Sequence, residues 1–201
     1  MAKTVELIFD FGSPNAYLVA GLLPDIAART GASIVYTPCL LGGIFKATNN
    51  LSPFQRFADV PAKLAYERLE MKRFIVRHTF TRFRLNPHFP VNTLVVMRGL
   101  IAAEKAGLGE PYRAAVLKAM WEDGEKMDDP DVVVRVLDAA GLDGQALVAA
   151  TQDPAVKQAL VANTEAAVAR GVFGIPTFFV GSEMFFGKER LGQVEDMLAA
   201  T

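Results

Sequence analysis

Apolar residues recur with two different spacings along this chain, and the changes of spacing predict its secondary structure. Residues 5–11, VELIFDF, and residues 33–37, SIVYT, are short runs rich in β-branched and aromatic side chains, which is typical of strands. Between the two runs, apolar residues recur every three or four positions, and this spacing predicts a helix. A strand, a helix and a second strand in this order predict a parallel pair with a right-handed crossover.

The first helix has clear start and stop signals. Ser13 is suited to the N-cap and Pro14 to the first helical position. Gly31 is expected to end the helix, and Pro24 inside it is expected to produce a kink.

A long stretch of helical spacing follows the second strand. Residues 40–50 predict a loop with a short helix, and no strand pattern interrupts the chain from residue 53 to about residue 141. Four segments carry apolar residues at helical spacing: 61–82, 92–106, 111–122 and 130–140. Another helix is predicted over residues 154–170, ending at Gly171.

The strand pattern returns near the C-terminus. Residues 177–180 and 183–186, separated by Gly181-Ser182, predict a β-hairpin, and residues 189–200 predict a last helix. The resulting order is that of an α/β protein with a thioredoxin-like fold and an inserted all-helical domain. Residues 1–40 and 155–201 are assigned to the thioredoxin-like domain and residues 41–154 to the insertion.

Composition narrows the choice of partners. The 201 residues are 51% hydrophobic, enough for a substantial core, and the net charge of −1 provides no general attraction to nucleic acid or to anionic membranes. The N-terminus lacks an uninterrupted apolar segment, and no stretch approaches the roughly 20 apolar residues that span a bilayer. The single cysteine, Cys39, cannot form an intramolecular disulfide. These features predict a soluble, cytoplasmic protein whose partners are small molecules or another subunit.

The start of the first helix is the main candidate for chemistry. A helix N-terminus favours an anion such as a thiolate. Redox thioredoxins have Cys-x-x-Cys there, whereas this chain has Ser13-Pro14-Asn15-Ala16, so dithiol exchange is excluded. The Ser13 hydroxyl can instead donate a hydrogen bond to the sulfur of another molecule and lower its pKa. The alternative is a plain N-cap, and no neighbouring histidine activates Ser13 as a nucleophile.

Three motifs together resemble a known family: FDFGSPNAYL at residues 9–18, GVFGIPTFFV at 171–180 and FFGKERLGQVE at 185–195. They are similar to the 2-hydroxychromene-2-carboxylate isomerases and the kappa-class glutathione transferases, in the DsbA-like branch of the thioredoxin superfamily. The resemblance implies that glutathione is the cofactor and that Ser13 and Asn15 bind it. It also implies a cis Ile175–Pro176 bond that presents backbone groups to glutathione, although an ordinary proline before a strand is the alternative.

Glutathione has two carboxylates and an ammonium, so its site needs polar groups at both ends. The resemblance assigns this role to Asn50 and to Lys188 and Glu189, with Arg190 as an additional candidate. Asn49 lies beside Asn50, so the assignment is open by one residue. The alternative is that Glu189 only complements a helix dipole and that Asn50 is part of a loop.

A second substrate is expected between the sheet and the helical domain. Lys46 and His88 are the candidates there, with Lys46 preferred because a small aromatic carboxylate needs a cation. The basic run Arg73, Arg77, Arg82 and Arg84 is better explained as a solvated helix face. The two histidines are isolated and Cys39 has no ligands at zinc spacing, so no metal is expected.

The resemblance implies a glutathione-dependent isomerase that interconverts 2-hydroxychromene-2-carboxylate and trans-o-hydroxybenzylidenepyruvate during aromatic hydrocarbon catabolism. The thiolate adds reversibly, so glutathione is returned unchanged. A kappa-class glutathione transferase is the first alternative, and a non-catalytic thioredoxin-like peptide-binding module is the second. Relatives of this kind also suggest a homodimer.

Overall fold

The computed structural model describes residues 3–200, so residues 1, 2 and 201 of the predicted domain ranges lie outside it. Its four-stranded sheet has the order β2-β1-β3-β4. The strands are β1 (Thr4–Phe9), β2 (Ser33–Pro38), β3 (Thr177–Val180) and β4 (Glu183–Phe186). β1 pairs parallel with β2 and antiparallel with β3. Leu7 lies opposite Tyr36 on one side and Phe178 on the other. The parallel pair and the hairpin are confirmed.

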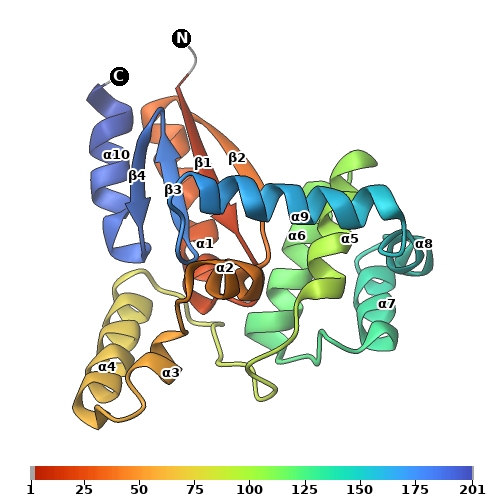
Figure 1. The fold of residues 1–201 in the computed structure, drawn as a ribbon, viewed down its shortest axis with the longest axis horizontal. Helices are drawn as coiled ribbons and strands as arrows, with labels where there is room; N and C mark the ends of the chain where they lie inside the picture. The colour runs from red at the N-terminus through yellow and green to blue at the C-terminus, as the bar shows by residue number, and fades with distance from the viewer. Residues whose placement is uncertain (1–2, 201) are drawn as a thin grey trace.

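Helix α1 (Pro14–Thr30) connects the two parallel strands. The Ser13 hydroxyl oxygen accepts a hydrogen bond from the Ala16 N–H at 3.2 Å, and Gly31 ends the helix with a φ of 69°, in the left-handed region that favours glycine. Both predicted end signals are therefore confirmed. In Figure 1, α1 lies behind the sheet and α9 (Pro154–Ala169) crosses in front of it, which gives three layers.

Helices fill the chain between β2 and α9. They are α2 (Leu41–Thr48), α3 (Pro53–Arg56), α4 (Pro61–Arg77), α5 (Leu94–Lys105), α6 (Gly109–Lys118), a π-helical turn η1 (Ala119–Asp123), α7 (Pro130–Ala139) and α8 (Gly144–Ala150). After β4 come a 3-10 turn, η2 (Lys188–Arg190), and α10 (Leu191–Ala200).

Three predictions about the helices are wrong. α4 ends at Arg77 and not at residue 82, so Arg82 and Arg84 belong to an irregular segment and not to a helix face. The seven-residue α8 was not predicted, because so short a helix gives little periodic signal. The last helix is preceded by η2, which contains Glu189.

A continuous core joins the sheet to the inserted helices. Trp121 is fully buried, and its indole Nε1–H donates to the Phe11 carbonyl at 2.9 Å. Its ring stacks on Phe83, with the ring planes 17° apart. Because Phe11 lies two residues before Ser13, this tryptophan fixes the insertion close to the start of α1.

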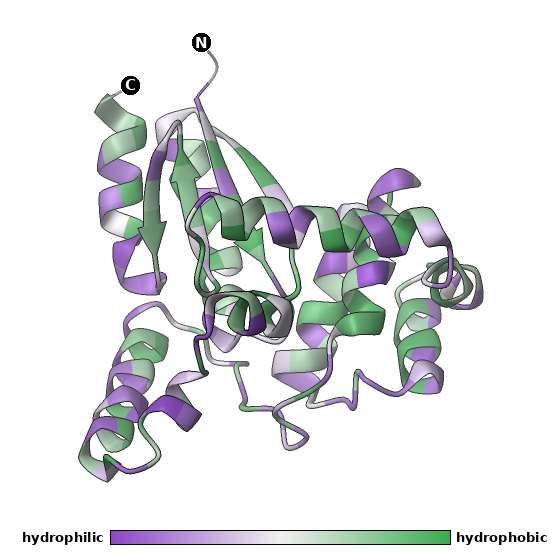
Figure 2. Cartoon of the chain, viewed as in Figure 1, coloured by the Kyte–Doolittle hydropathy of each residue, from purple (hydrophilic) through white to green (hydrophobic). Residues whose placement is uncertain are grey.

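One corner of the molecule is less well packed. Helices α3 and α4 project from the body (Figure 1) and contain no buried residue. Figure 2 shows hydrophobic and hydrophilic positions interspersed along α4. Within residues 3–200, no helix is both long and apolar enough to cross a bilayer.

Candidate functional site

The start of α1 meets the turn before β3. The Ser13 hydroxyl donates to the Ile175 carbonyl oxygen at 3.0 Å, although the two residues are 162 positions apart. Ser13 is 4% exposed, and the Ile175–Pro176 peptide bond is cis. The structure therefore brings together the two motifs that the sequence identified separately.

Several polar groups at this junction have no protein partner. The backbone N–H groups of Asn15 and Ile175 make no hydrogen bond within residues 3–200. The Asn15 side-chain oxygen is buried and also has no partner in that range. A buried polar group without a partner costs free energy. The junction thus leaves two backbone N–H donors unused, with a buried acceptor on Asn15 beside them.

The loop before Pro176 is held by Asn50. The Asn50 amide donates to the Phe173 carbonyl at 2.9 Å, and its oxygen accepts from the Leu51 N–H at 2.9 Å. Asn49 forms the C-cap of α2 with a φ of 52°. Asn50, and not Asn49, therefore contacts the loop that carries Ile175.

The turn before α10 lies on the other side of Pro176. The Gly187 N–H donates to the Pro176 carbonyl at 3.0 Å, which places η2 next to the cis proline. Lys188 is only 5% exposed, and its ammonium pairs with Glu189 and lies 5.4 Å from the centre of the Phe74 ring. Lys188 therefore points into the protein, whereas the Glu189 side chain remains 56% exposed.

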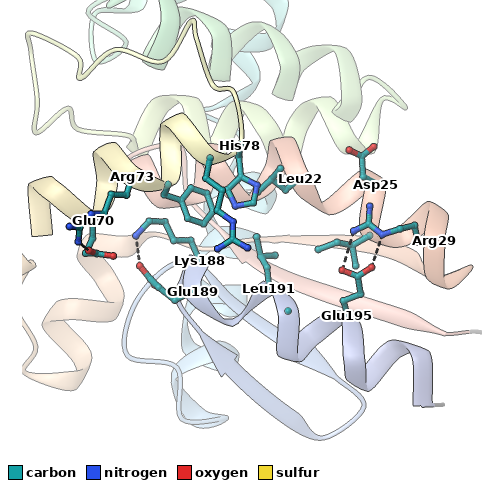
Figure 3. A pocket seen from close by; sticks show the side chains of 14 residues that line it. Leu22, Asp25, Arg29, Glu70, Arg73, His78, Lys188, Glu189, Leu191 and Glu195 are labelled. Carbon is teal, nitrogen blue, oxygen red and sulfur yellow. Dashed lines mark hydrogen bonds and ion pairs between the residues drawn. The ribbon is translucent and has the colours of Figure 1, made fainter.

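A charged hollow of about 700 Å³ opens beside η2, between α1, α4 and α10. Figure 3 shows that both signs of charge line it: Arg29, Arg73, His78 and Lys188 among the basic groups, and Asp25, Glu70, Glu189 and Glu195 among the acidic ones. Arg29 and Glu195 form a two-pronged ion pair at 2.6 and 3.0 Å. Burial and the charge of Arg77 lower the pKa of His78. Such a wall suits a zwitterionic ligand.

The structure does not connect the two residues predicted for the second substrate to Ser13. Lys46 is exposed in the last turn of α2 and forms no ion pair with any described residue. His88 is exposed too, in a loop that Asn86 anchors through its amide bonds to the carbonyls of Met120 and Glu125. Their proposed role stays a prediction.

Sequence reasoning did not identify Asp10. This side chain is 1% exposed and accepts hydrogen bonds from the Gly12 N–H at 2.8 Å and the Leu41 N–H at 2.7 Å. Burial raises the pKa of Asp10, and these bonds and one from Thr93 oppose the rise. Asp10 thus ties the turn before Ser13 to the start of α2. A carboxylate between Phe9 and Phe11, at the end of the predicted strand, was the available signal.

Tyr17 was also not singled out. It lies one helical turn beyond Ser13, and its hydroxyl donates to Glu122 at 2.9 Å, while Arg82 approaches the other Glu122 oxygen at 3.2 Å. Burial, together with Glu122, raises the pKa of Tyr17. The three residues border a second hollow of about 510 Å³ between α1 and α6.

Cys39 does not contribute to this site. Its thiol is buried and donates to the Asn163 carbonyl at 3.4 Å, and burial raises its pKa to about 12. It is a structural residue at the end of β2, as predicted, and not a nucleophile. Across residues 3–200, no group of three or more His, Cys, Asp or Glu side chains could hold a metal ion.

The fold and the site define the class of the protein: a thioredoxin-like protein in which a serine replaces the redox dithiol opposite the cis proline. A family model described as the DsbA-like thioredoxin domain matches residues 4–199.

Comparisons with individual proteins narrow this class. The chain is 30% identical over 194 residues to the 2-hydroxychromene-2-carboxylate isomerase of Pseudomonas sp. (strain C18), covering 96% of this chain and 88% of the relative. It is 26% identical over 216 residues to glutathione S-transferase kappa 1 of Homo sapiens, and the match covers 98% of this chain and 92% of the relative. A solved 2-hydroxychromene-2-carboxylate isomerase superposes with a TM-score of 0.84 at 27% identity, covering 98% of this chain and 95% of that one.

The chain therefore belongs to the DsbA-like thioredoxin family, in the group that contains the 2-hydroxychromene-2-carboxylate isomerases and the kappa-class glutathione transferases.

Proposed function

We propose that this protein is a glutathione-dependent isomerase that interconverts 2-hydroxychromene-2-carboxylate and trans-o-hydroxybenzylidenepyruvate in the catabolism of aromatic hydrocarbons. The observation that carries the proposal is the contact between the Ser13 hydroxyl and Ile175 at the start of α1, where redox relatives have a dithiol. The isomerases among its relatives, which match over nearly the full chain, support the reaction. The buried, unpaired thiol of Cys39 suits a reducing compartment, so we assign the protein to the cytoplasm.

The unpartnered groups at the junction fit glutathione. When bound, glutathione supplies a thiolate that adds reversibly to a conjugated double bond, so that rotation about the resulting single bond becomes possible. Ser13 and the N–H of Asn15 would hold the sulfur at the positive end of α1. Ile175 would pair its free N–H with the cysteinyl backbone.

The Ser13 hydroxyl has a single hydrogen to donate. It is directed at the Ile175 carbonyl in this structure, so stabilising a sulfur anion requires the hydroxyl to rotate away from that carbonyl. Because the oxygen accepts from the Ala16 N–H, its position is fixed while its hydrogen can turn. Ser13 would thus lower the thiol pKa before addition and stabilise the thiolate again when it leaves.

The charged ends of glutathione would extend away from Ser13 in two directions. Glu189 keeps its carboxylate accessible and would pair with the γ-glutamyl ammonium. Lys188 would act through its charge and backbone, since its ammonium is already paired with Glu189. Asn50 would keep the Ile175 loop in place through Phe173 and contact the peptide from there. Lys46, which forms no ion pair with any described residue, would hold the carboxylate of the second substrate.

A kappa-class glutathione transferase is the second candidate, favoured by the human relative that covers 98% of this chain. The same site would then activate the thiolate, but the conjugate would leave and glutathione would be consumed. The fate of glutathione therefore distinguishes the two functions.

The test follows conversion of 2-hydroxychromene-2-carboxylate while free thiol is titrated. We expect glutathione to raise the rate at least about 100-fold, with no loss of thiol, and S-methylglutathione to give no stimulation because it lacks the nucleophile. Loss of one thiol per turnover would identify a transferase. An equal rate without glutathione would contradict both functions.

We also propose that the protein is a homodimer formed through α4. Tyr66, Leu69 and Val76 are 52%, 43% and 69% exposed. Their spacings of three and seven residues place them on one face of α4. An apolar stripe of this kind is unusual on a monomer and suits burial against its own copy.

Replacing Leu69 with glutamate should convert the dimer to a monomer, because it places a charge inside the proposed interface. Sedimentation velocity of the wild type and the variant measures this change, with dimer dissociation expected to increase at least about 100-fold. Leu108→Glu is the matched control, since Leu108 is 36% exposed at the start of α6, a helix that lies apart from α4 in Figure 1. A wild-type protein that sediments as a monomer at micromolar concentration would rule out the interface.

A further inference from the structure

A third hollow opens beside α9. Its volume is about 430 Å³, and α2, α5 and α9 form its walls. Most of the lining side chains are apolar, among them Leu40, Leu94, Leu160 and Val161. None of the residues assigned above to glutathione or to the second substrate lines it. Its size falls in the usual range for small-molecule pockets.

Arg98 of α5 is the unusual residue in this wall. Its Nε is buried and has no hydrogen-bond partner, and its guanidinium forms no ion pair with any residue in the described range 3–200. An arginine remains charged at all physiological pH values, and a buried donor without a partner is costly. The Arg98 Nε–H is therefore a buried donor without an acceptor within residues 3–200.

The other polar groups in the hollow do not supply that acceptor. Thr164 uses its hydroxyl in bonds to the Leu40 N–H at 3.0 Å and the Leu160 carbonyl at 2.7 Å. Glu165 lines the hollow without an ion pair to Arg98, and Lys157 adds a second cation that is also unpaired within residues 3–200. The wall thus carries two positive charges and one negative charge around an apolar floor.

We propose that this hollow binds a small amphipathic carboxylate, with the apolar body against Leu94 and Val161 and the carboxylate on Arg98. The guanidinium offers a carboxylate two parallel N–H donors, and the apolar walls strengthen that pair by excluding water. Lys157 adds attraction at the rim. The site is separate from the proposed glutathione chemistry and does not depend on it.

The probe is 2-naphthoate, with naphthalene-2-carboxamide as its uncharged analogue. Titration is followed through the NMR methyl signals of Leu94 and Val161, with glutathione present throughout. We expect 2-naphthoate to shift both methyl signals with a Kd below about 1 mM, and the carboxamide to bind at least about tenfold more weakly. Ser13→Ala should leave the titration unchanged, because Ser13 does not line this hollow.

Arg98→Met keeps an unbranched apolar stem and the helix propensity of the side chain while removing the guanidinium, and it should weaken 2-naphthoate binding at least about tenfold. Lys105→Met, an exposed cation of the same helix, is the matched control and should have no effect. Equal binding of acid and amide, or unchanged affinity in Arg98→Met, would overturn the proposal. A third result would also overturn the proposal: 2-naphthoate shifts neither methyl signal, and a Val161→Asp variant sediments differently from the wild type. The hollow would then be an interface between copies of the chain.

Discussion

Replacing Ser13 with alanine is expected to lower kcat of the isomerase reaction at least about 100-fold, which corresponds to roughly 2.7 kcal/mol of lost transition-state stabilisation. The hydroxyl is the side-chain donor placed at the start of α1 and opposite Ile175. Without the Ser13 hydroxyl, the pKa of the thiol of bound glutathione should rise by about one unit or more, because a hydrogen bond to the thiolate is lost. The ultraviolet absorption of the thiolate, followed against pH, measures that rise directly.

The sign of the pH effect follows from the same bond. Donation to the thiolate lowers the thiol pKa, so its removal moves the rising limb of the rate profile to higher pH. At sufficiently high pH the variant should therefore recover part of its rate.

Ser13 also caps α1, so stability must be separated from catalysis. The alanine variant loses the cap to Ala16 and leaves the Ile175 carbonyl without its hydroxyl donor. Ser13→Gly is the control, because glycine costs an N-cap only a few tenths of a kcal/mol relative to serine. Equal loss of activity in the two variants, despite different melting temperatures, would assign the effect to the hydroxyl. A thiolate pKa that is unchanged in both would contradict the proposed role.

Replacing Trp121 with alanine is expected to lower the free energy of unfolding by about 3–5 kcal/mol. The side chain is fully buried, stacks on Phe83 and donates to the Phe11 carbonyl at 2.9 Å. The variant loses all of this packing and leaves a cavity between the insertion and the end of β1. Urea denaturation followed by circular dichroism measures the change in the free energy of unfolding.

Trp121→Phe separates the hydrogen bond from the bulk of the ring. It retains most of the apolar contact but leaves the Phe11 carbonyl unpaired, so a loss of about 1–3 kcal/mol is expected. Leu85→Ala, at a side chain that is 58% exposed, should change stability by less than about 0.5 kcal/mol. A Trp121→Ala protein as stable as this control would show that the insertion is not fastened to the sheet by Trp121.

Local signals were sufficient for most of the fold. The N-cap serine, the N1 proline and the terminal glycine of α1 act on neighbours within one helical turn, and the structure agrees at each position. The hairpin around Gly181-Ser182 was equally accessible, because both strands and the turn lie within ten residues. The order of the strands and helices along the chain then restricted the topology to the thioredoxin-like arrangement.

The prediction for α4 failed for a tertiary reason. Phe80 and Phe83 extend the apolar pattern beyond Arg77, but they serve an irregular segment that packs on Tyr17. Thr79, with a φ of 56°, lies just after the end of the helix. Apolar side chains mark burial, and burial alone does not separate a helix from a loop fixed against the core.

The sequence by itself determined the order of the strands, the caps of α1, the absence of a dithiol and the buried role of Cys39, because each depends on residue identity or on near neighbours. Only the tertiary structure decided that Ser13 meets Ile175, that Asn50 rather than Asn49 holds the Phe173 loop, and that Lys188 turns inward to Glu189. The physical reason is that a polar group's partner is set by packing between segments that local preferences do not place. The same reason explains why Arg98, unremarkable in the sequence, became recognisable only when its Nε was seen to be buried without a partner in the described range.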